Sequence, residues 1–110
     1  MKNKKNICVI GSGFSGISAA TYLSELGHNV FVLEKNSIHG GRARKFTSKG
    51  YTFDMGPSWY WMPDVFEKYF KDFGKDINDY FKLKRLDPSY RVYFSEDQII
   101  DIPSNYESLK

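Results

Sequence analysis

A glycine-rich segment near the N-terminus, Gly11-Ser12-Gly13-Phe14-Ser15-Gly16, limits the possible folds of this chain more narrowly than any other part of its sequence. Residues 7–10 before it are a short apolar run rich in β-branched side chains, which is typical of a strand. From Phe14 the apolar residues repeat at helical spacing up to a stop at Gly27, and residues 30–33 form a second strand-like run. A strand, a helix and a strand within about thirty residues predict a βαβ unit with parallel strands and a right-handed crossover.

The same apolar patterns predict which side chains of this unit are buried. Residues 7–10 are continuously apolar, which is typical of a buried parallel strand, so Cys8 is expected to be a small buried side chain. Because Cys8 is the single cysteine, an internal disulfide is excluded. The helix is expected to gather its apolar side chains on roughly one side, formed by Ile17, Ala20, Tyr22, Leu23 and Leu26.

The glycines and one acidic residue together predict a dinucleotide site. Gly11 allows a tight turn off the strand, Gly13 leaves room for a pyrophosphate beside the backbone, and Gly16 lets the helix pack closely. The N–H groups of residues 13–16 would point at the phosphates. Glu34 ends the second strand eighteen residues after Gly16, where a carboxylate accepts hydrogen bonds from the adenosine ribose. Its charge would repel a 2′-phosphate, so NADP is disfavoured.

The next segment separates FAD from NAD, which the glycine fingerprint alone does not. Gly40-Gly41-Arg42 follows soon after Glu34, and the combined pattern resembles the amine-oxidase-like and phytoene-desaturase-like flavoproteins. In that family the arginine lies against the cofactor, so the resemblance implies FAD and a contact from Arg42. The residue types agree, because two glycines let the backbone run close to the pyrophosphate or flavin while a guanidinium offsets negative charge.

Downstream segments are similar to the phytoene desaturase branch in particular. Residues 51–58 read YTFDMGPS and residues 62–66 read MPDVF, and the similarity continues through residues 86–92. It therefore extends over essentially all 110 residues. The resemblance implies non-covalent FAD, removal of hydride from a long polyene hydrocarbon, association with a membrane, and Gly56 and Pro57 near the flavin.

The predicted fold class is α/β, with a Rossmann-type FAD-binding βαβ unit running into the start of a mixed α+β substrate domain. We expect residues 1–56 to form the cofactor-binding segment and residues 57–110 to begin the substrate region. No residue is assigned a catalytic role, and no metal site is expected because no histidines and cysteines stand at ligand spacing. The candidate cofactor-binding residues are Gly11, Gly13, Phe14, Ser15, Gly16, Glu34, Lys35, Gly41, Arg42, Gly56 and Pro57.

The rest of the chain carries signals for further elements. Ser104-Asn105-Tyr106-Glu107 is a capping-box pattern, which starts a helix close to the last residue. Because two parallel strands also leave an uncovered sheet, we expect the chain to be the front of a longer protein. The other predicted elements are two short strands in residues 44–53 around Lys49-Gly50, an aromatic-faced helix from Pro63 to Gly74, a turn at Asp87-Pro88, and a hairpin of residues 91–94 and 99–102.

The function predicted from these features is flavin-dependent desaturation of a phytoene-type polyene in carotenoid biosynthesis. We expect the complete protein to be the enzyme and the 110-residue chain alone to be inactive. One alternative is an amine-oxidase-like or protoporphyrinogen-oxidase-like flavoenzyme. Another is a non-catalytic nucleotide-binding fragment.

Composition and charge restrict the partners. The formal net charge of +3 is spread along the chain, so nucleic acid is not an expected partner. One cysteine and the absence of a long apolar stretch predict a cytoplasmic location, with peripheral contact at the inner face of the membrane left open. Aromatic residues reach 17%, and Trp59, Tyr60 and Trp61 either line an apolar channel for a lipophilic substrate or pack in the interior.

Overall fold

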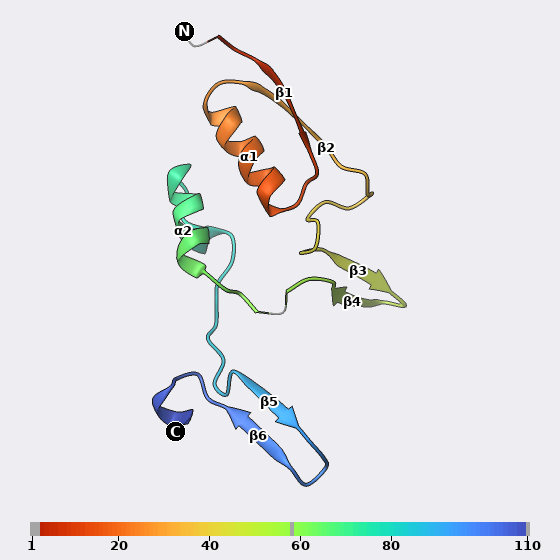
Figure 1. Cartoon of the computed structure of the whole chain (residues 1–110), viewed down its shortest axis with the longest axis vertical. Helices are drawn as coiled ribbons and strands as arrows, with labels where there is room; N and C mark the ends of the chain where they lie inside the picture. The colour runs from red at the N-terminus through yellow and green to blue at the C-terminus, as the bar shows by residue number, and fades with distance from the viewer. Residues whose placement is uncertain (1–2, 58, 110) are drawn as a thin grey trace. The chain divides into compact units, whose positions relative to one another are not determined.

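The computed structural model of this chain describes residues 3–57 and 59–109, in two compact units, residues 1–61 and 62–110 (Figure 1). The first unit contains β1 (Asn6–Ile10), α1 (Phe14–Glu25), β2 (Asn29–Leu33), β3 (Lys45–Ser48) and β4 (Tyr51–Asp54). The second contains α2 (Pro63–Asp72), the 3₁₀ helix η1 (Ile77–Asp79), β5 (Tyr90–Tyr93), β6 (Ile99–Ile102) and the 3₁₀ helix η2 (Glu107–Leu109). Every strand and helix predicted from sequence has a counterpart within a few residues, although the last helix is only a short 3₁₀ turn.

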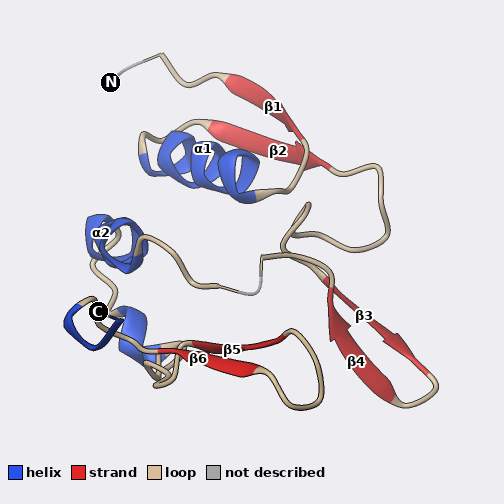
Figure 2. Cartoon of the chain, turned by 60° about the horizontal axis from the view of Figure 1, so that its bottom comes forward, coloured by secondary structure: helices blue, strands red, loops and turns tan. Residues whose placement is uncertain are grey.

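The βαβ unit predicted from the glycine-rich segment is confirmed. β1 and β2 pair in parallel, with Ile7 opposite Val30 and Ile10 opposite Leu33. The amide of Gly11 extends the pairing beyond β1 by donating to the carbonyl oxygen of Leu33 at 2.7 Å. α1 lies along the strand pair in both views (Figures 1 and 2). The glycine-rich segment therefore stands where β1 ends and α1 begins.

The predicted burial of β1 is wrong. Its side chains alternate between half-buried and exposed, and the exposed set includes Cys8 and Ile10, of which Ile10 is 86% exposed. Successive side chains of a strand point to opposite faces, so a helix on one face covers only every second residue. Burial of a continuous apolar run would require a second covering layer, which no described element of the first unit provides.

The predicted apolar side of α1 is only partly correct. Ala20 is buried and Leu23 is half-buried, but Ile17, Tyr22 and Leu26 are exposed. A two-stranded sheet offers a narrow surface, so only one stripe of the helix can contact it.

A hairpin follows the βαβ unit, as predicted. β3 and β4 are antiparallel, and the rings of Phe46 and Phe53 stack across them with centroids 5.0 Å apart. Lys49 and Gly50, between the strands, both have positive φ angles, 51° and 83°, which is the geometry of a tight hairpin turn.

The second unit is held together by aromatic rings at α2 and by a strand pair at its other end. Phe70 of α2 lies 4.8 Å from the ring of Tyr80 and 6.4 Å from that of Phe81, and Ile77 between them in sequence is buried. β5 and β6 are antiparallel, with Arg91 opposite Asp101. Among the described helices, none combines the length and apolar content needed to cross a bilayer.

The helix start predicted at Ser104 is displaced by one residue. The side chain of Asn105, rather than that of Ser104, accepts the amide of Ser108 at 2.8 Å, and η2 follows. The amide of Ser104 instead donates to a carboxylate oxygen of Asp87 at 3.0 Å. Asn and Ser cap helices about equally well, so the sequence pattern alone does not distinguish between the two positions.

Candidate functional site

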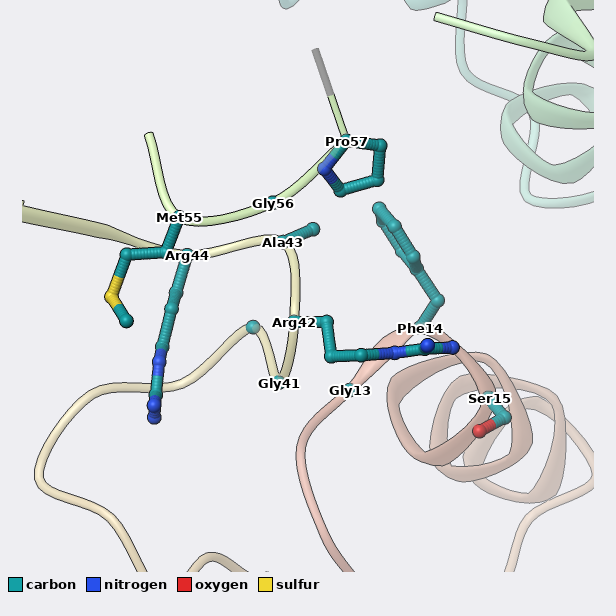
Figure 3. A pocket seen from close by; sticks show the side chains of 11 residues that line it. Gly13, Phe14, Ser15, Gly41, Arg42, Ala43, Arg44, Met55, Gly56 and Pro57 are labelled. Carbon is teal, nitrogen blue, oxygen red and sulfur yellow. The ribbon is translucent and has the colours of Figure 1, made fainter. Parts of the chain in front are cut away.

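Three loops of the first unit meet at the start of α1 and line one cavity of about 890 Å³ (Figure 3). They are the glycine-rich loop after β1, the loop before β3, and the loop after β4. The lining residues are Gly13, Phe14, Ser15, Gly40, Gly41, Arg42, Ala43, Arg44, Met55, Gly56 and Pro57.

The first loop and α1 are in contact through their backbones. Gly11 has a φ of +97°, which an L side chain rarely adopts, and it turns the chain from β1 toward the helix. A Cβ atom on Gly16 would lie 2.0 Å from the carbonyl oxygen of Gly11 and 3.6 Å from Cγ1 of Val9. Any side chain at position 16 would therefore push α1 away from β1 and from the loop.

The second loop packs on the first in the same manner, and the third packs on the second. A Cβ atom on Gly41 would lie 3.0 Å from Cα of Gly13, and the amide of Gly40 donates to the carbonyl oxygen of Ser12 at 3.0 Å. A Cβ atom on Gly56 would lie 2.3 Å from the carbonyl oxygen of Arg42. The three loops therefore contact one another through their backbones, with least room for a side chain at Gly56.

The cavity is electropositive. Its lining contains two arginines and no carboxylate. Figure 3 shows the side chain of Arg42 reaching toward Phe14 and Ser15 at the start of α1, while Arg44 extends in a different direction. The first intrahelical bond of α1 runs from Ile17 to Gly13, the cap residue Gly13 has no side chain, and the first turn contains no acidic residue. A guanidinium and the positive end of a helix dipole therefore face the same space, which suits an anion.

Glu34 connects the first loop to the segment after β2 through hydrogen bonds. One carboxylate oxygen, Oε2, accepts the amide and the hydroxyl of Ser12 at 2.9 and 2.8 Å. The other, Oε1, accepts the amide and the side-chain Nδ2 of Asn36 at 2.9 and 2.8 Å. These bonds, first that from the Asn36 amide and then those from Ser12, lower the pKa of Glu34 from 4.5 to about 2. Ser12 itself is only 6% exposed.

The structure brings seven of the sequence-predicted residues to the cavity and leaves four outside its lining. The seven are Gly13, Phe14, Ser15, Gly41, Arg42, Gly56 and Pro57. Gly11 and Gly16 lie against each other where the first loop meets α1. Glu34 binds Ser12, and Lys35 is an exposed loop residue.

Four lining residues were absent from the sequence-based candidates: Gly40, Ala43, Arg44 and Met55. The amide of Met55 donates to the carbonyl oxygen of Arg44 at 2.7 Å, which continues the β3–β4 pairing by one step. The predicted hairpin of residues 44–53 already contains Arg44, and continuing its register about the Lys49-Gly50 turn would have placed Met55 opposite it.

The aromatic residues after the third loop are exposed. Trp59 and Trp61 are 61% and 69% exposed, and their rings stack with centroids 6.3 Å apart. Of the two sequence-based interpretations, interior packing does not describe them in this structure. Nor do three or more His, Cys, Asp or Glu side chains gather as a possible metal site anywhere in the part of the chain that the structure describes.

Comparisons with known proteins connect this geometry to a family. Residues 9–74 match the family model described as NAD(P)-binding Rossmann-like domain. The chain is 48% identical over 105 residues to the carotenoid 3,4-desaturase of Haloarcula japonica, covering 96% of the chain and 21% of that protein. It is 41% identical over 104 residues to the 4,4'-diapophytoene desaturase (4,4'-diaponeurosporene-forming) of Staphylococcus aureus, covering 94% and 21% respectively.

The chain thus spans about a fifth of the length of the curated relatives it matches. The resemblance to carotenoid desaturases that the sequence motifs predicted is confirmed, and so is the Rossmann-like α/β class of the first unit.

Proposed function

We propose that this chain, which belongs to the family of NAD(P)-binding Rossmann-like domains, binds FAD in the cavity where its three loops meet. FAD and NAD share an adenosine diphosphate half, so one type of nucleotide-binding fold can serve either. The observation that carries the proposal is that Arg42 and the uncapped start of α1 face one cavity that has no carboxylate in its lining. That arrangement suits a pyrophosphate.

The glycine contacts support the fit of a large nucleotide. A Cβ atom would lie 3.0 Å from a main-chain atom at Gly41 and 2.3 Å from one at Gly56, so backbone groups rather than side chains form much of the cavity wall. The cavity volume of about 890 Å³ lies within the range of small-molecule and cofactor sites. We assign Gly13, Ser15 and Arg42 to the pyrophosphate, and Glu34 to the adenosine ribose.

Residues at the far side of the cavity are assigned to the flavin half. Met55, Gly56 and Pro57 line the cavity from the loop after β4. An apolar thioether and a proline ring on this side would keep water from the reacting part of the cofactor. When bound, FAD would supply the acceptor for the two electrons removed in a dehydrogenation.

We propose that the whole protein desaturates a carotenoid precursor. Dehydrogenation of such a polyene removes a hydride and a proton from neighbouring carbons and leaves one new carbon–carbon double bond. The names and the 48% and 41% identities of the two relatives support this substrate class. We assign residues 57–110 to the beginning of the substrate-binding region. We assign no side chain a catalytic role, because the flavin carries the redox chemistry.

A lipophilic substrate suggests where the protein works. We propose a cytoplasmic location with peripheral contact at the inner face of the membrane. The exposed rings of Trp59 and Trp61 support this proposal, because tryptophan side chains are typical of the boundary between membrane and water.

Binding of FAD to the purified chain tests the first proposal. We expect titration with FAD to quench flavin fluorescence and to leave yellow protein after gel filtration. Gly13→Val and Glu34→Ala should lose this binding. Gly13→Ala is the control for the arrangement of the loops. A single Cβ there would lie 3.8 Å from Cα of Gly41, which is an ordinary contact that keeps the loops in place. Full flavin occupancy in Gly13→Val would reject the site.

Assay of the protein that carries these residues tests the second proposal. We expect conversion of a phytoene-type polyene, followed by the absorbance of the lengthened conjugated system, and no turnover of amines or protoporphyrinogen. Turnover of an amine in place of the polyene would assign the protein to another branch of the flavoenzymes. A chain that stays colourless with FAD although it is folded would support a fragment without cofactor.

A further inference from the structure

We infer that the side chain of Asn36 competes with the adenosine ribose for Glu34 and thereby sets the affinity of the site for adenine nucleotides. This inference rests on the proposed function, because it takes Glu34 as the group that receives the ribose hydroxyls. Asn36 is exposed and lies outside the cavity lining. Its role would be to occupy a binding position rather than to contact the ligand.

The carboxylate of Glu34 has no acceptor position to spare. A carboxylate offers about four lone-pair positions, two on each oxygen. In this structure Ser12 supplies two donors to Oε2, and Asn36 supplies two donors to Oε1, all at 2.8 to 2.9 Å. A ribose diol brings two further O–H donors, so at least one of the present donors has to leave.

The donors from Ser12 are the costlier pair to remove. Ser12 is buried, and its carbonyl oxygen accepts the amide of Gly40 at 3.0 Å, so it joins the first two loops of the cavity. Displacing its hydroxyl would leave a buried polar group without a partner, which costs more than the net value of the bond itself. The ribose is therefore not expected to replace Ser12.

Asn36 can leave at much lower cost. Its Nδ2 group is on an exposed side chain, so rotation away from Glu34 exchanges one hydrogen bond for bonds to water. The backbone amide of Asn36 can stay on Oε1, because it belongs to the turn after β2. The ribose thus takes the position of the Asn36 side chain, and only a ligand with hydroxyl donors can make this exchange.

The test is a cycle of two protein variants and two ligands, measured by calorimetry on the full chain. The ligands are ADP and 2′,3′-dideoxy-ADP, which lacks both ribose hydroxyls. We expect Asn36→Ala to bind ADP about three- to tenfold more tightly than the wild type, because no side-chain donor has to be displaced. Binding of the dideoxy nucleotide should stay unchanged. Ser37→Ala, at the next exposed position, is the control and should match the wild type with both ligands.

Each other outcome overturns a defined part of the argument. If Asn36→Ala binds ADP equally or more weakly, Asn36 does not compete with the ribose. If it binds ADP and the dideoxy nucleotide more tightly by the same factor, the exchange does not involve the hydroxyls, and the inference also fails. If the wild type binds no ADP while far-UV circular dichroism shows it folded, the proposed nucleotide site itself is wrong.

Discussion

Each of the two units of this chain is stabilised internally, and the kind of contact differs between them. In residues 1–61 the critical contacts join backbone to backbone, at Gly16, Gly41 and Gly56, where a Cβ atom would lie within 3.0 Å of another main-chain atom. In residues 62–110 the contacts join side chains, through the rings around Phe70 and the ion pair of Arg91 with Asp101. A cavity walled by backbone needs the first kind of contact, because side chains would fill the space that a cofactor requires.

The difference predicts unequal tolerance to mutation. A side chain added at a backbone contact has no space into which to move, so its effect should be abrupt. Truncating one ring of a partly exposed cluster leaves the other rings and the solvent to fill the gap, so its effect should be graded.

The largest effect is expected for Gly16→Ala. Helix propensity alone would favour alanine by about 1 kcal/mol, but the new Cβ would lie 2.0 Å from the carbonyl oxygen of Gly11. We expect a loss of about 3 kcal/mol or more in the free energy of unfolding of the first unit, and loss of FAD binding.

Gly74→Ala is the matched change in the second unit. Its φ is +65° and no atom lies within 4 Å of the added Cβ, so backbone strain alone should cost about 1–2 kcal/mol. Urea unfolding of both variants measures the two losses in the free energy of unfolding. Equal losses would show that crowding at Gly16 is not the dominant factor.

A smaller effect is expected for Phe70→Ala. The ring contacts Tyr80 and Phe81 and is half-buried, so its removal should cost about 2–3 kcal/mol, below the value for a fully buried phenylalanine. Amide hydrogen exchange in α2 should speed up while FAD binding to the first unit stays unchanged. Val65→Ala, at an exposed position of the same helix, should alter exchange little. Loss of FAD binding in Phe70→Ala would contradict the independence of the two kinds of contact.

Glu34 should make the stability of the first unit depend on acid. Its pKa is lowered from 4.5 to about 2, so the folded state favours the charged carboxylate. The resulting stabilisation is fully present above about pH 4.5 and is lost as the pH falls toward 2. We therefore expect the difference in urea midpoint between the wild type and Glu34→Gln to be constant near neutrality and to shrink through this window. A difference that does not vary with pH would mean that the Ser12 and Asn36 bonds do not favour the charged form.

The smallest effect is expected for Arg91→Ala. Arg91 donates through Nη2 to Asp101 at 2.8 Å across the β5–β6 pair, and this contact raises the pKa of Arg91 and lowers that of Asp101. Both side chains are exposed, so water and salt screen the pair, and we expect less than about a fivefold change in the unfolding equilibrium constant. Asp101→Ala should give the same change, and the double variant should add little. A large and salt-independent loss would place this pair among the main contacts of the second unit.

The elements that sequence predicted well are those with local signals. The glycine-rich segment, the Lys49-Gly50 turn and the Pro63 helix start each act through the backbone preferences of a few neighbouring residues. Burial was predicted less well, because it depends on what covers an element. Cys8 and Ile10 are apolar in sequence, yet no described element of the first unit covers their face of the sheet.

The residues of the cavity and those that bind Glu34 divide in the same way. Gly13, Gly41 and Arg42 were found because they belong to compact motifs. Arg44 and Asn36 were not, since their roles depend on a neighbouring strand and on the carboxylate of Glu34. A compact sequence motif therefore predicts which residues line the cavity, but not the contacts made by residues outside the motif.

The exposed apolar face of the β1–β2 pair predicts that the chain associates with copies of itself. Ile10, Phe31 and Leu33 are all more than half exposed on these two strands. Exposed apolar strands can add further strands or stack with copies of themselves, and both processes grow with concentration. We therefore expect light scattering of the chain to rise with concentration and the apparent stoichiometry of nucleotide binding to fall with it.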